Sequence, residues 1–68
     1  MNFTIEIEQE EDGRWIAEVT DLPGVMVYGN TREEATSHVQ ALALRVLAEQ
    51  IEHTETTTIP MTISFLAA

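Results

Sequence analysis

The stretch DLPGVMVYGNTREEA, residues 21–35, constrains the fold of this chain more than any other segment. Pro23 fixes its own φ and biases Leu22 toward an extended backbone, and Gly24 accepts the positive φ that a tight turn requires. Leu22-Pro23-Gly24 therefore predicts the end of one strand, and the apolar run VMVY after it predicts a short strand over residues 25–28.

The same stretch also contains a helix start. Gly29 ends the short strand, and Thr31-Arg32-Glu33-Glu34 has the spacing of a capping box. In such a box the Thr31 hydroxyl accepts a hydrogen bond from the amide three residues on, and the Glu34 carboxylate accepts one from the amide of Thr31. No residue from Thr31 to about His53 breaks a helix. Apolar residues recur there on one stripe at helical spacing, namely Ala35, Val39, Leu42 and Val46.

Alternating polar and apolar residues predict the remaining strands. FTIEIE at residues 3–8 alternates strictly, and Asp12-Gly13 predicts a hairpin turn into a second strand over 14–20. Trp15 points to the apolar side of that second strand, which favours packing in the core. The threonine-rich TETTTIP at 54–60 ends the helix, because β-branched residues and proline disfavour it. A last strand follows, with an apolar face made of Met61, Ile63 and Phe65.

The predicted order of elements is strand, strand, strand, helix, strand, in a single domain over residues 1–68. This order predicts an α+β fold in which one long helix lies on one face of a small, largely antiparallel sheet, made of three antiparallel strands plus the C-terminal strand. The other face of the sheet then carries the acidic side chains of the first two strands, Glu6, Glu8 and Glu18.

These three carboxylates have two interpretations. A solvated strand face is the preferred one, and a metal site serving a nuclease is the distant alternative. Like charges directly opposite one another destabilise a sheet unless something neutralises them. A basic protein would neutralise them, so Glu6, Glu8 and Glu18 are candidates for a protein interface.

The apolar arc of the predicted helix is broad, because Leu44, Leu47 and Ile51 extend it beyond the stripe that faces the sheet. A helix over residues 31–53 is about 33 Å long, whereas the sheet is only about 20 Å across. We therefore expect the last turns to overhang, either under the following loop or against another protein. The second reading is favoured, and it predicts a homodimer with these three side chains near the interface. Pairing of exposed strand edges is the competing route to a dimer.

Composition limits the classes of function. Twelve acidic residues stand against three arginines and no lysine, which gives a net charge of −9. Nucleic-acid binding relies on lysine and arginine, so we expect no direct binding to DNA or RNA and favour a basic protein as the partner. The chain has no cysteine, no basic signal peptide and no apolar run of about 18 residues, so we expect a cytoplasmic protein outside the membrane.

No constellation for catalysis or cofactor binding stands out. His38 and His53 lie about 22 Å apart along the predicted helix, too far to share one metal ion. No nucleophile elbow of the form G-x-S-x-G is present, and neither histidine has a catalytic context. We therefore expect no enzymatic activity, no cofactor and no metal.

The residues GRWIAEVTDLPG, Gly13 to Gly24, followed by YGNTREEA, Tyr28 to Ala35, resemble the HicB family of antitoxins from bacterial toxin–antitoxin pairs. The resemblance covers about residues 1–60. It implies a partial ribonuclease-H-like fold that is catalytically silent and that neutralises a small basic ribonuclease toxin, HicA, by covering its surface.

Members of that family usually continue into a helix-turn-helix or ribbon-helix-helix segment that binds operator DNA. This sequence shows no such segment, so we expect no operator binding. The competing hypothesis is an orphan homo-oligomeric domain with a regulatory or ligand-binding role and no toxin partner.

Overall fold

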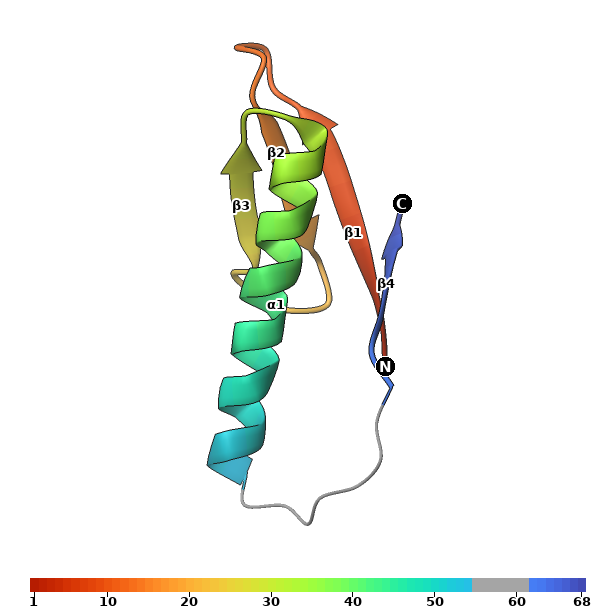
Figure 1. Cartoon of the computed structure of the whole chain (residues 1–68), viewed down its shortest axis with the longest axis vertical. Helices are drawn as coiled ribbons and strands as arrows, with labels where there is room; N and C mark the ends of the chain where they lie inside the picture. The colour runs from red at the N-terminus through yellow and green to blue at the C-terminus, as the bar shows by residue number, and fades with distance from the viewer. Residues whose placement is uncertain (55–61) are drawn as a thin grey trace.

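The computed structural model describes residues 1–54 and 62–68. The elements in chain order are β1 (Asn2–Gln9), β2 (Trp15–Val19), β3 (Met26–Gly29), α1 (Arg32–Thr54) and β4 (Ser64–Ala67). The strands form one sheet in the order β3-β2-β1-β4, and α1 lies on one face of it (Figure 1). The predicted α+β fold and its order of elements are confirmed. Met61 and the loop predicted after the helix lie outside the described residues.

The sheet is mixed: its first three strands are antiparallel, as predicted, and the direction of the C-terminal strand, which the sequence left open, is parallel to its neighbour. β1 pairs antiparallel with β2, and β2 with β3, but β4 runs parallel to β1. The cause is the direction of α1, which carries the chain from the end of β3 back toward the end of the sheet where β1 starts (Figure 1). Phe3 lies opposite Phe65 across this parallel pair, with ring centroids 5.8 Å apart.

Two glycines allow the chain to turn or to approach itself closely between β2 and α1. Gly24 has a φ of +82°, as the Leu22-Pro23-Gly24 turn predicts, and residues with a Cβ are strained there. Gly29 has a different role, because a Cβ at that position would lie 2.5 Å from the amide nitrogen of Ala35. The backbone at the end of β3 therefore contacts the first turn of α1 directly, because Gly29 has no side chain to separate them.

The start of α1 is capped by side chains from both ends of the predicted capping box. The Glu34 amide donates to the Thr31 hydroxyl at 3.0 Å, as predicted. The Glu34 carboxylate accepts from the amide of Asn30 at 3.4 Å, and not from that of Thr31. The long glutamate side chain thus reaches one residue beyond the N-cap, which still satisfies an amide at the helix start.

The core lies between α1 and the helix-facing side of the sheet. Trp15 is half-buried and packs against this core, in agreement with the prediction. Ala43 and Leu47 continue the buried stripe of α1, while Leu42 and Val46 flank it and are only partly buried. The buried side chains are Phe3, Ile5, Ala17, Val19, Leu22, Val25, Ala35, Val39, Ala43 and Leu47.

The burial of Leu47 corrects the prediction that it overhangs the sheet. The last turns of α1 do extend past the ends of β2 and β3 (Figure 1). Leu47 nevertheless belongs to the core, with only 4% of its surface exposed. Four-residue steps from Ala35 lead to this position, so Leu47 stays on the buried side of the helix. Leu44 and Ile51 are about half exposed, at 47% and 49%.

Candidate functional site

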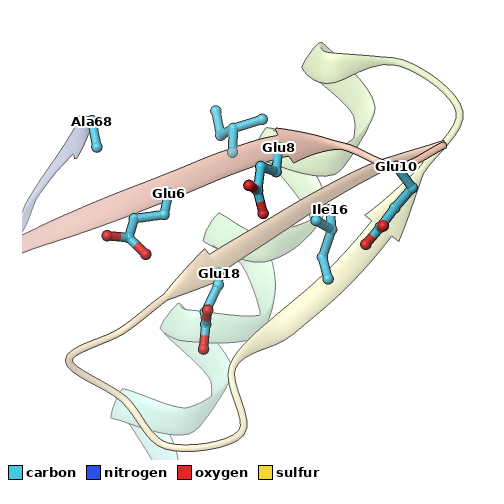
Figure 2. A pocket seen from close by; sticks show the side chains of 7 residues that line it. Glu6, Glu8, Glu10, Ile16, Glu18 and Ala68 are labelled. Atoms are coloured by element: carbon cyan, nitrogen blue, oxygen red, sulfur yellow. The ribbon is translucent and has the colours of Figure 1, made fainter. Parts of the chain in front are cut away.

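The sheet face opposite α1 is the candidate site, and we call it the acidic face. Its centre is formed by alternate residues of β1 and β2, whose side chains point away from the helix (Figure 2). The strand register places Glu6 directly opposite Glu18 and Glu8 directly opposite Ile16. The three carboxylates singled out in the sequence thus lie on neighbouring strands of the same face.

An open hollow of about 420 Å³ lies over this part of the sheet. Glu10 lies beside the other acidic side chains there, although only Glu6, Glu8 and Glu18 were predicted on this face. The sequence does indicate this position of Glu10, because Glu6, Glu8 and Glu10 are spaced at the two-residue period of a strand. The hollow is lined by Glu6, Ile7, Glu8, Glu10, Ile16, Glu18 and Ala68.

The carboxylates of the acidic face have no cationic partner among residues 1–54 and 62–68. The salt bridges in this part of the chain join Arg14 to Asp12 and His53 to Glu49. Glu6 and Glu18 therefore confront each other across the ladder without a neutralising charge, an arrangement that costs about 0.2–1 kcal/mol. A cation brought by another molecule would relieve this repulsion.

Arg14 is the cation that reaches toward this face, and it is already engaged. Its guanidinium lies over the ring of Tyr28, 4.5 Å from the centroid, and its Nε donates to Asp12 at 2.7 Å. The Arg14 amide also donates to the other carboxylate oxygen of Asp12 at 3.0 Å. These hydrogen bonds, that of the backbone amide first, lower the pKa of Asp12.

Apolar side chains border the carboxylates on the β3 side. Met26 lies opposite Glu18, and Tyr28 lies opposite Ile16, so all four share the acidic face. Met26 and Tyr28 are 48% and 46% exposed. Their alternation within VMVY is the sequence signal for this border. The face therefore combines uncompensated negative charge with accessible apolar surface.

In residues 1–54 and 62–68, no group of three or more His, Cys, Asp or Glu side chains is placed to hold a metal ion. His38 and His53 are both exposed on α1, away from the acidic face. No helix in this part of the chain combines the length and the apolar character that crossing a membrane requires.

Comparison with protein-family models, with curated proteins and with solved structures finds no match to this chain.

Proposed function

We propose that this chain is an antitoxin-like protein-binding module, similar to members of the HicB family. Its proposed partner is a small basic ribonuclease of the HicA type, which the chain neutralises. The observation that carries the proposal is the Glu6–Glu18 pair on the open sheet face, which has no cationic partner among the described residues. The resemblance of residues 13–24 and 28–35 to HicB proteins supports it independently.

The charge of the chain favours such a partner. A net charge of −9 attracts a basic protein over distance and raises the rate of encounter. At contact, arginine or lysine side chains of the partner fill the hollow between Glu6, Glu8 and Glu18 and neutralise their repulsion. Met26 and Tyr28 provide the apolar surface that the contact removes from water.

In this proposal the chain itself carries out no chemistry. It acts by covering the surface on which the toxin binds or cleaves RNA, and the sheet holds the carboxylates of Glu6, Glu8 and Glu18 in a fixed arrangement. The alternative function is that of a homo-oligomeric regulatory domain without a toxin, and the open, partly apolar groove beside Val27 and Leu42 favours it.

An inhibition assay tests the proposal. A HicA-type ribonuclease is incubated with labelled RNA and increasing amounts of this chain. We expect cleavage to stop near stoichiometric amounts, whereas the chain alone leaves RNA intact in the presence of Mg²⁺ or Mn²⁺. The double variant Glu6→Gln/Glu18→Gln should bind the toxin at least about tenfold more weakly, because it removes the charges that face the partner.

The matched control is Glu33→Gln/Glu52→Gln, which changes the net charge equally but on the exposed surface of α1. It should inhibit almost as well as the original chain. Undiminished cleavage at a large excess of this chain would contradict the proposal. An equal loss in both double variants would show that only the total charge matters and not the acidic face.

A further inference from the structure

The outer edge of β3 presents backbone groups that the sheet does not use. β3 is the last strand of the sheet, and only β2 pairs with it among the described residues. The Val19 amide donates to the Val25 carbonyl at 3.0 Å. In an antiparallel ladder this bond determines which residues of β3 direct their backbone amide and carbonyl toward β2 and which direct them outward. Val27 therefore directs its amide and carbonyl toward β2, and Tyr28 directs both groups outward. The Met26 carbonyl also points outward, while the Met26 amide donates to Gly24.

Beside this edge, α1 and β3 enclose an open groove of about 360 Å³. Its walls are mostly apolar and partly buried, formed by Val27, Ala41 and Leu42. Its rim is basic, because His38 and Arg45 are both exposed there. The groove thus lies on the side of the sheet that α1 covers, away from the carboxylates of the acidic face.

We propose that the β3 edge and this groove form the interface of a homodimer. Two β3 strands pair antiparallel about a twofold axis at Val27, so that the Tyr28 amide of each copy donates to the Met26 carbonyl of the other. The result is a continuous eight-stranded sheet with both helices on one face and both acidic faces on the other. The two grooves then face each other and are closed by side chains of the opposite copy.

The distribution of charge favours this surface over the acidic face for self-association. Each copy carries −9, so two copies repel unless they meet where carboxylates are sparse or cations are present. Contact through the acidic face would bring Glu6, Glu8 and Glu18 against their own counterparts. The groove instead offers Arg45, whose guanidinium the negative field of a second copy attracts.

The geometry also gives Arg45 an acidic counterpart. Gly29 lies against Ala35, and Val27 lines the groove together with Leu42. The twofold axis at Val27, in the middle of β3, therefore passes α1 near residue 40. A twofold rotation then places Arg45 of one helix opposite the first turn of the other. That first turn carries Glu33 and Glu34.

The interface is small, which sets the expected affinity. A strand of four residues and one stripe of a helix bury less than the roughly 1,600 Å² of a standard interface. We therefore expect a dimer that dissociates in the micromolar range. A second copy remains the favoured occupant, because a chain of this length gains from the additional apolar burial.

Sedimentation equilibrium over about 5–500 µM, a range that brackets the expected dissociation constant, tests the proposal. The original chain should pass from monomer to dimer across it. Arg45→Glu should weaken the dimer at least about tenfold, because it places a carboxylate opposite the acidic first turn. The matched control Asn2→Asp/Gln50→Glu makes the same change of net charge at exposed positions away from both the groove and the first turn of α1, and it should leave the dissociation constant within about threefold.

A second pair of variants tests the strand pairing. Tyr28→Pro removes the outward amide, whereas Tyr28→Val removes the ring but keeps the amide, so only the proline variant should lose the dimer. If Tyr28→Pro fails to fold, hydrogen exchange of the original chain decides, since the Tyr28 amide should become more protected as concentration rises.

Three results would overturn the proposal. One is a monomer at all concentrations, and another is an equal effect of Arg45→Glu and the control Asn2→Asp/Gln50→Glu. The third is a dimer that survives Tyr28→Pro but is lost on Leu66→Glu, which would move the interface to the β4 edge. None of these results bears on toxin binding through the acidic face, so the two proposals fail separately.

Discussion

Glu6 lies directly across the β1–β2 ladder from Glu18, on the face of the sheet that α1 leaves uncovered. Two like charges in register oppose folding, and no cation of the described residues pairs with either of them. The arrangement becomes favourable once a basic surface covers it. The proposed binding of a basic protein to the acidic face depends on this pair of carboxylates.

Neutralising one member of the pair should stabilise the isolated chain. We expect Glu18→Gln to raise the free energy of unfolding by about 0.2–1 kcal/mol in low salt, because the cross-strand repulsion disappears. The gain should shrink in about 0.5 M salt, where exposed charges are screened. Urea unfolding of both proteins measures it, and Glu52→Gln on α1 is the control. A destabilised Glu18→Gln would mean that Glu18 makes a favourable contact instead.

The two glycines around β3 should respond differently to substitution. At Gly24 the constraint is the φ of +82°, with no atom within 4 Å of a Cβ, so Gly24→Asn should be tolerated and Gly24→Val should cost about 1–3 kcal/mol. At Gly29 the constraint is contact with the backbone of Ala35, so even Gly29→Ala should cost about 1–3 kcal/mol. Thermal melts of the three variants test this, and a neutral Gly29→Ala would show that β3 and α1 separate easily.

Leu47 and Leu44 provide a matched test of the helix face. Leu47 is 4% exposed, so Leu47→Ala should cost about 2–5 kcal/mol through lost burial and the remaining cavity. Leu44 is 47% exposed, and Leu44→Ala should change the free energy of unfolding by less than about 1 kcal/mol. Chemical denaturation of both variants gives the comparison. Similar losses in the free energy of unfolding for the two variants would mean that Leu47 lies on the surface, as expected if the last turns of the helix overhang the sheet.

Asp12 should titrate below an ordinary aspartate, because hydrogen bonds from the Arg14 amide and then its side chain lower its pKa from 3.8. A lowered pKa in the folded chain means that the ionised carboxylate adds stability above the unfolded pKa. That stability is lost as the pH falls through the folded value. A carboxyl titration by NMR measures the pKa. Arg14→Gln should raise it only in part, since the backbone amide of residue 14 still donates, and a full return to 3.8 would contradict this.

Local signals in the sequence were sufficient for the elements and their order. Gly24 predicts its turn and Thr31 its cap because each depends on atoms within three residues. The alternation of Glu6 and Glu8 with apolar residues gives the two faces of β1 for the same reason. These features do not depend on where distant segments finally lie.

The features that the sequence left open, and the one wrong placement, that of Leu47, concern relationships between distant segments. The parallel direction of β4 depends on the end of the sheet to which α1 returns the chain, and no local pattern encodes it. The burial of Leu47 depends on which part of the broad apolar arc meets the sheet. The groove beside Val27 likewise arises from the angle between α1 and β3. The pairing of Glu6 with Glu18 required the exact hairpin register, which one residue of slippage would change.

An NMR titration of the isotopically labelled chain with a HicA-type ribonuclease shows which surface the toxin contacts. We expect the largest shifts of amide signals to cluster on the acidic face, at Glu6, Glu8, Ile16 and Glu18. Binding should weaken steeply as salt rises, because the contact is between opposite charges. Shifts confined to α1, or no shifts at concentrations of about 100 µM, well above the dissociation constant expected for a specific inhibitor, would contradict binding through the acidic face.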